Sequence, residues 1–129
     1  KDYLLTQTKE KLLIVTKTAL QKVIENIKPG ITTAQDIGSI IEEHVNSQGH
    51  YVIKEYGGHG IGHEMHEAPF IPNYKISVKH NAIIPENSAI CVEPLVQIDN
   101  SLVELSTDNW TVFSPQEKLN AHFEHTIWI

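Results

Sequence analysis

The sequence is poor in cysteine and in basic residues, and it has no long apolar run. A single cysteine, Cys91, cannot form a disulfide within the chain, and this usage is typical of a reducing compartment, so we expect a cytoplasmic protein. Lysine and arginine total 10 against 16 aspartates and glutamates, which gives a formal net charge of -6. Because no cluster of basic residues occurs, we expect neither nucleic acid nor an anionic membrane surface as a partner. Apolar runs such as AICV and PLV are far shorter than the roughly 20 residues of a membrane-spanning helix.

Two segments near the N-terminus have the spacing of helices with one buried face. In residues 1–28 this spacing joins Leu5, Leu12, Leu13, Thr16, Leu20, Val23, Ile24 and Ile27. The sequence KPG at positions 28–30 predicts the end of this helix, because glycine favours a helix C-terminus and proline cannot continue a helix. A second helix is predicted to begin after Thr33, with Asp36 completing a capping box, and to end at Gly49. We interpret both helices as scaffold.

From Gly49 onward the sequence is typical of short strands. Segments rich in β-branched and aromatic residues alternate with turn-forming residues, in the order YVIKEY, SAICVEPLVQI, SLVEL, WTVF and HFEHTIWI. Two helices followed by a series of strands predict an α+β fold, with the two helices packed on a mainly antiparallel sheet. At 129 residues the chain is expected to form one folded unit.

Two glutamates interrupt segments that are otherwise apolar. Glu93 lies in ICVEPLV and Glu124 lies in FEHTIWI, and neither segment contains a lysine or an arginine. An unpaired carboxylate in a buried strand is strongly unfavourable, so each glutamate must be protonated, paired or bound to a metal ion, unless it points to solvent. Because a histidine cluster also occurs in the chain, we interpret both glutamates as candidate metal ligands.

The glycine-rich segment GGHGIGHEMHEAP contains the histidines that best suit such a site. Glycines on both sides of His59 allow the backbone and a ligand to approach closely, and an imidazole with two carboxylates suits Mn, Co, Fe or Zn. His66 follows seven residues later, and strict strand alternation would place it on the opposite face. A site shared by both histidines therefore predicts a turn or bulge at Gly60 or Gly62. We interpret four other histidines as surface residues: His44, His50, His63 and His80.

These residue types predict hydrolysis of a peptide or amide bond. Carboxylates and a histidine would hold divalent metal ions that activate water for attack on a carbonyl group, while a second histidine stabilises the developing charge. Three ligands, His59, Glu93 and Glu124, are one or two too few for a paired-metal site. We therefore expect further ligands from a segment that precedes these residues.

Five segments occur in a specific order along nearly the whole chain: IKPGITTAQDIG, EYGGHGIGHEMHEAPFIPNY, ICVEPLVQ, DNWTV and AHFEHTIWI. This ordered set resembles the type I methionine aminopeptidases of the pita-bread metallopeptidase superfamily. The resemblance implies a pita-bread fold and a site with two divalent metal ions. It also implies a substrate, namely a peptide or nascent protein from which the initiator methionine is removed.

The resemblance further implies roles for individual residues. His59 matches the family's histidine ligand, Glu93 its first glutamate ligand, and Glu124 the glutamate that bridges the two metal ions. His66 matches the histidine that hydrogen-bonds the scissile amide and stabilises the tetrahedral intermediate. The positions that match the pocket for the methionine side chain are Met65 and Trp110. Thioether and aromatic surfaces suit a flexible thioether substrate.

The family takes two aspartate ligands and a further substrate-contacting histidine from a half-domain that precedes the matching region. Residues 1–129 therefore resemble the C-terminal part of one catalytic domain, and we expect the upstream half to be the partner that completes the site. Three local departures concern loops rather than ligands. IIPENSAI replaces a Pro-Gly turn, Gly57 stands where cysteine is common, and DNWTV replaces DGWTV.

Two alternatives to a methionine aminopeptidase stay open. A proline-directed peptidase of the same superfamily also has a second histidine seven residues after the first, but its final strand usually carries an arginine and an acidic pair where this chain reads FEHT. The other alternative is an inactive half-domain that acts only as a binding module. We expect the isolated chain to bind divalent metal weakly and to hydrolyse little.

Overall fold

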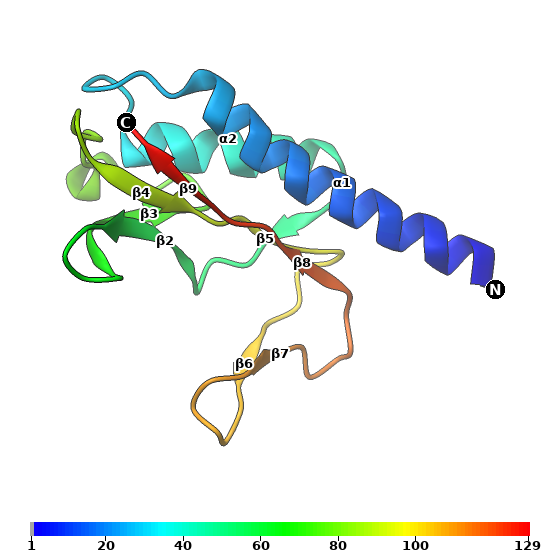
Figure 1. The fold of residues 1–129 in the computed structure, drawn as a ribbon. Helices are drawn as coiled ribbons and strands as arrows, with labels where there is room; N and C mark the ends of the chain where they lie inside the picture. The colour runs from blue at the N-terminus through cyan, green and yellow to red at the C-terminus, as the bar shows by residue number, and fades with distance from the viewer. Residues whose placement is uncertain (1) are drawn as a thin grey trace.

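The computed structural model describes residues 2–129, in which two helices lie over one side of a set of antiparallel strands (Figure 1). The long helix α1 (Asp2–Asn26) packs against α2 (Ala34–Ser47). The strands are β1 (Tyr51–Val52), β2 (Gly57–Ile61), β3 (Glu67–Pro72), β4 (Ala89–Val92), β5 (Leu95–Gln97), β6 (Glu104–Leu105), β7 (Val112–Phe113), β8 (Asn120–His122) and β9 (His125–Trp128), and a 3-10 turn, η1 (Val78–His80), follows β3. All strand pairings are antiparallel, which confirms the predicted α+β class.

The strands form three sheets rather than one. The strand orders are β1-β5-β8, β3-β2-β4-β9 and the separate hairpin β6-β7. Figure 1 shows this hairpin projecting away from the helices. The segments predicted as single strands around Glu93 and Glu124 are each split in two, because the chain passes from one sheet to another at both points. The prediction that the two glutamates lie within strands is therefore wrong, and for Glu93 the reason is Pro94, which has no N–H to continue a ladder.

The predicted boundaries of both helices are confirmed. The Thr33 hydroxyl accepts a hydrogen bond from the backbone N–H of Asp36 at 3.1 Å, and the Asp36 carboxylate accepts one from the backbone N–H of Thr33 at 2.9 Å. Gly30 and Gly49, which follow the two helices, have φ values of 67° and 75°. Glycine adopts this left-handed region without steric cost, which explains the end of α2 at the residue after its cap, Gln48. Gly30 lies in the turn after α1 rather than at its last residue, Asn26.

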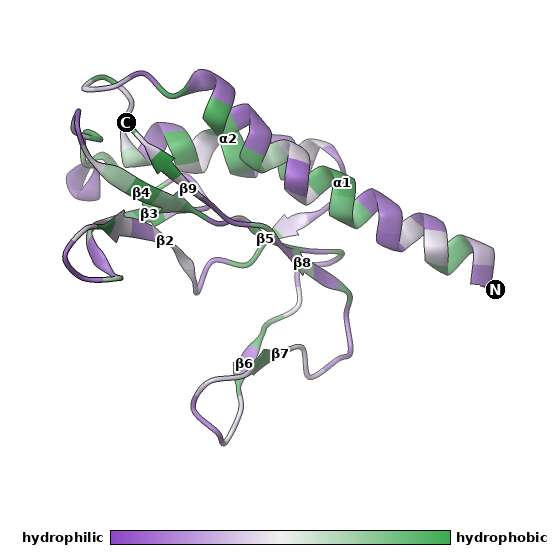
Figure 2. Cartoon of the chain, viewed as in Figure 1, coloured by the Kyte–Doolittle hydropathy of each residue, from purple (hydrophilic) through white to green (hydrophobic). Residues whose placement is uncertain are grey.

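The hydrophobic core lies between the helices and the two larger sheets. Its members include Leu12, Val15, Ala19 and Leu20 from α1, Ile37, Ile41 and Val45 from α2, and Ile71, Ile90, Val92 and Val96 from the strands. Figure 2 shows hydrophobic and hydrophilic residues alternating along α1. The first turns of α1 extend past the sheets (Figure 1), so Leu5 is exposed. Leu13, farther along the helix, is also exposed, so the prediction that both leucines belong to the buried face is wrong. Within residues 2–129, no helix is both long enough and apolar enough to cross a bilayer.

Replacing Thr33 with alanine is expected to destabilise the protein by about 1 kcal/mol, because it removes the acceptor for a helix N-terminal N–H group. The midpoint of urea denaturation measures this change. The matched control is Thr8→Ala in the exposed part of α1, where the hydroxyl only donates to the Leu4 carbonyl within the helix. An equal response of the two variants would contradict a capping role for Thr33.

Candidate metal centre

Strand pairing places Glu93 and Glu124 opposite each other. Both residues lie at the points where the chain passes between the same two sheets. The residue pairs on either side of these points are Val92 with His125 and Leu95 with His122. Continuing this register from either side sets Glu93 across from Glu124, so two carboxylates that are far apart in the sequence meet at one position.

β2 brings His59 to the same position. His59 pairs with Cys91 in β4, and Glu93 follows Cys91 by two residues, at the diagonal position on the same face. The distance from Nε2 of His59 to Oε1 of Glu93 is 3.4 Å, and the side chains are only 15% and 14% exposed. Nδ1 of His59 lies 2.8 Å from the carbonyl oxygen of Gly60. A carbonyl oxygen only accepts, so Nδ1 carries a proton, and in the neutral ring the lone pair is on Nε2 beside Glu93.

The separation of these two donor atoms fits a divalent cation. A lone pair on nitrogen and a carboxylate oxygen repel each other unless a proton or cation lies between them. Ligand atoms at roughly 2.0–2.1 Å from a tetrahedral zinc ion lie about 3.3 Å apart. The observed 3.4 Å between His59 and Glu93 agrees with this value. Imidazole nitrogen and carboxylate oxygen are also the donors that such ions prefer.

Negative charge is concentrated at this point of the molecule. Burial raises the pKa of the Glu93 carboxyl above its ordinary value and the charge of Glu124 raises it further, while His122 and His59 act in the opposite direction. Within residues 2–129, neither Glu93 nor Glu124 has a lysine or arginine as an ion-pair partner. A bound cation would offset the repulsion between the two carboxylates.

His122 also belongs to this cluster, and sequence reasoning did not identify it. Its Nε2 lies 3.2 Å from Oε2 of Glu93. One ligand atom from each of Glu93, His122 and Glu124 can be chosen so that all three lie within 4.8 Å of one another. His122 precedes Glu124 by two residues, and residues two apart in an extended chain share a face. This spacing in HFEH is the sequence signal that could have indicated it.

The chain reverses between His59 and His66 and brings the two rings together. β2 and β3 pair in antiparallel fashion, and their register shifts between His59 and Gly60, which confirms the predicted irregularity. The ring centroids are 4.3 Å apart. A Cβ atom on Gly60 in β2 would lie 2.2 Å from the carbonyl oxygen of Ala68 in β3, so the close approach of these two strands favours glycine. His66 is exposed and can contact a bound molecule.

A cavity of about 550 Å³ opens beside Glu93. Its lining contains Glu93 and His122 together with apolar and aromatic residues, among them Tyr56, Leu95, Phe113 and Trp110. Trp110 lines this cavity although its side chain is 86% exposed, and Met65, which is also exposed, does not line it. The roles of Met65 and Trp110 in substrate binding stay predictions.

Asparagines occupy the left-handed turn positions of the two loops, IIPENSAI and DNWTV, in which the sequence departs from the family pattern. Asn87 and Asn109 have φ values of 57° and 56°, in the left-handed region that favours glycine and tolerates asparagine better than most residues. Asn109 replaces the glycine of DGWTV, and the Asp108 carboxylate closes its turn by accepting hydrogen bonds from the backbone N–H groups of Trp110 and Thr111. The turn that presents Trp110 therefore does not require glycine.

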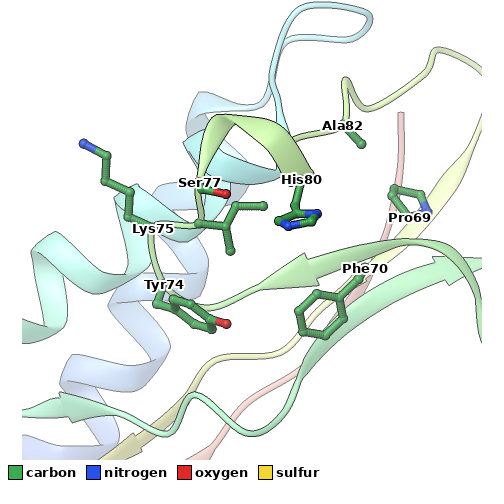
Figure 3. Close-up of a pocket in the computed structure, with 8 residues that line it drawn as sticks. Pro69, Phe70, Tyr74, Lys75, Ser77, His80 and Ala82 are labelled. Atoms are coloured by element: carbon green, nitrogen blue, oxygen red, sulfur yellow. The ribbon is translucent and has the colours of Figure 1, made fainter.

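A second cavity, of about 440 Å³, contains none of the predicted ligands. It lies between β3 and η1, where Phe70, Tyr74 and His80 contribute to its lining (Figure 3). Figure 3 shows the Lys75 side chain pointing away from the other lining residues. This cavity is separate from the carboxylate cluster.

One of the four histidines expected at the surface is buried. His63 and His80 are exposed and His44 is half-buried, but His50 is only 6% exposed. After the turn at Gly49 the chain enters β1, and the His50 ring folds back so that its Nδ1 donates to the carbonyl oxygen of Gln48 at 2.9 Å. The prediction of a surface position is therefore wrong for His50.

Comparisons with known proteins identify the family of this chain. The family model described as "Metallopeptidase family M24" matches residues 3–129. The methionine aminopeptidase of Mycoplasma capricolum is 44% identical over 118 residues, which cover 92% of this chain and 46% of that protein. The chain spans about half the length of the curated relatives it matches.

Solved structures give the same result for the fold. The crystal structure of methionine aminopeptidase from Thermotoga maritima superposes with a TM-score of 0.85 at 39% sequence identity, covering 93% of this chain and 47% of that one. The prolidase from Pyrococcus furiosus superposes with a TM-score of 0.63 at 24% identity, covering 95% and 30% of the two chains, and supports the pita-bread fold alone. By its fold and by the match over residues 3–129, the chain belongs to metallopeptidase family M24.

Proposed function

We propose that the full-length protein removes N-terminal methionine from peptides and nascent proteins in the cytoplasm, using two divalent metal ions. The observation that carries this proposal is the meeting of Glu93, Glu124 and the lone pair of His59 at one point, in a chain 44% identical to a methionine aminopeptidase. We assign His59 and Glu93 as ligands of one ion and Glu124 as the bridge to the second. The remaining ligands would come from a part of the protein outside this chain.

When bound, such ions activate water as a nucleophile at neutral pH and polarise the scissile carbonyl group. The residues of this chain set the geometry around that chemistry. The hydrogen bond from Nδ1 to Gly60 fixes the tautomer and the ring plane of His59. The lone pair of Nε2 therefore stays available to a metal ion. Burial of Glu93 restricts water at its carboxylate and strengthens the interaction with a cation.

The position of His66 supports a role on the substrate rather than on the metal. Its ring lies against that of His59, and its side chain is exposed at the edge of the cluster. From this position an imidazole N–H can donate to the scissile amide and stabilise charge that develops as the carbonyl is attacked. We therefore assign His66 as the catalytic residue of this half of the site.

The adjoining cavity supports a preference for methionine. Its volume of about 550 Å³ and its aromatic lining, which includes Trp110 and Phe113, suit a flexible thioether side chain. Glu93 lines the same cavity, so a side chain held there would keep its own peptide bond close to that carboxylate. We assign Trp110 to the pocket. We assign Met65 to a part of its wall that residues outside this chain would complete.

A panel of three tripeptides tests the proposal. The full-length protein, supplied with Co²⁺ or Mn²⁺, is incubated with Met-Ala-Ser, Leu-Ala-Ser and Ala-Pro-Ser, and the released amino acids are measured. We expect release of methionine alone. Preferential cleavage of Ala-Pro-Ser would replace the proposal by a proline-directed peptidase, and absence of cleavage with metal demonstrably bound would replace it by an inactive binding module.

A further inference from the structure

We propose that His122 is a positioning residue for the metal centre: its Nε2–H holds one oxygen of Glu93, so that the other oxygen faces His59. This inference rests on the metal site proposed above. It adds to that site a residue that none of the matched motifs assigns.

Glu93 lies between two imidazole rings. Its Oε1 is 3.4 Å from Nε2 of His59, and its Oε2 is 3.2 Å from Nε2 of His122. A carboxylate oxygen only accepts hydrogen bonds, so if no cation lies between His122 and Glu93, their contact has the proton on Nε2 of His122. The Glu93 side chain is only 14% exposed, which limits the water available to Oε2. A carboxylate that binds metal through one oxygen needs a partner for the other, and His122 is in position to be that partner.

The backbone on both sides of this contact is fixed. The fully buried Asn73 donates from Nδ2 to the carbonyl oxygen of Glu93 at 2.9 Å. His122 is held in β8 through its pairing with Leu95 in β5. Because neither backbone can shift easily, the remaining freedom of the Glu93 carboxylate is rotation of its own side chain. The hydrogen bond from His122 restricts that rotation.

The geometry favours orientation over direct ligation by His122. Its side chain is 44% exposed, against 15% for His59, and its Nε2 faces the Glu93 oxygen that is turned away from His59. If Nε2 donates to Glu93, it has no lone pair to offer a metal ion. Orientation and ligation therefore require opposite protonation of the same nitrogen, and an experiment can separate them.

Titration of Co²⁺ into the metal-free, full-length protein provides the first test. We expect His122→Ala to lower the affinity for Co²⁺ by about 10- to 100-fold, the usual effect of losing a residue that orients a ligand. We expect His122→Gln to restore most of this loss, because its amide N–H can reach the same carboxylate oxygen. Unchanged affinity in His122→Ala would overturn the inference. A His122→Gln variant as weak as His122→Ala would also overturn it, since an amide replaces a hydrogen-bond donor but not an imidazole ligand.

The proton NMR spectrum of the Co²⁺-loaded protein provides a second test. The Nδ1–H of a metal-bound His59 is protected by its hydrogen bond to Gly60 and should give a hyperfine-shifted signal. We expect His122→Ala to leave the number of such imidazole signals unchanged. Loss of one signal would identify His122 as a ligand and overturn the positioning role.

Two further variants separate this inference from the proposed function. His59→Ala should lower the affinity for Co²⁺ at least as much as His122→Ala, and if it does not, the proposed metal site itself fails. A loss in His59→Ala without a loss in His122→Ala would reject only the positioning role. His63→Ala, in an exposed position of the loop between β2 and β3, is the matched control and should bind Co²⁺ like the unaltered protein.

Discussion

Replacing Glu124 with glutamine in the full-length protein is expected to reduce hydrolysis of a methionyl peptide by about 100-fold or more. The change removes a negative charge opposite Glu93, at the position assigned to the bridge between two cations. An amide offers one neutral oxygen and an NH₂ group, and it cannot bridge two cations as a carboxylate does. The same variant should therefore bind less metal, which plasma emission analysis of the dialysed protein measures.

The control for this prediction is Glu10→Gln on the exposed surface of α1, which changes the net charge equally and lies far from the cluster in the sequence. It should retain both activity and metal content. In the absence of metal, the unfolding temperature of Glu124→Gln should be close to that of the unaltered protein, because Glu124 is exposed. Turnover at the unaltered rate by Glu124→Gln would contradict its assignment as a ligand.

Replacing Gly58 with alanine should destabilise the protein by about 3 kcal/mol or more. A Cβ atom at Gly58 would lie 2.0 Å from the carbonyl oxygen of Cys91 in the neighbouring strand β4, so the two strands would have to separate. The strain falls on backbone atoms, which cannot rotate away as a side chain can. Because these strands carry His59 and Glu93 toward each other, metal binding should weaken together with stability. A decrease of roughly 10 °C in the unfolding temperature is the expected measurement.

Gly62→Ala is the matched control for this variant. Gly62 is exposed, and its added Cβ would meet only the carboxylate end of Glu67, which can move. We expect a change of about 0.5 kcal/mol or less at this position. Equal unfolding temperatures for Gly58→Ala and Gly62→Ala would show that strands β2 and β4 do not pack at the observed distance.

Local sequence signals predicted the parts of the fold that short-range chemistry determines. The capping box of Thr33 and Asp36 involves residues three positions apart, so the sequence alone is sufficient to recognise it. The irregularity after His59 was predicted because two histidines an odd number of residues apart could share a site only if the strand bulged. The burial of His50 depends on how the chain folds after Gly49, and no local pattern indicates it.

The arrangement of the cluster could not be predicted in the same way. Glu93 and Glu124 meet because two strand breaks coincide in register, and register is a property of pairing between distant segments. The sequence alone predicts no role for His122, because its contact with Glu93 depends on pairing between distant segments. Only the register that sets β8 beside β5 reveals its distance to Glu93.

An anomalous difference map from a crystal of the full-length protein soaked in Zn²⁺ would test the central claim most directly. The account predicts a peak at roughly 2.0–2.2 Å from both Nε2 of His59 and an oxygen of Glu93, with Glu124 at ligand distance from the same ion or its neighbour. Strong zinc peaks elsewhere in the protein, with none between His59 and Glu93, would contradict it.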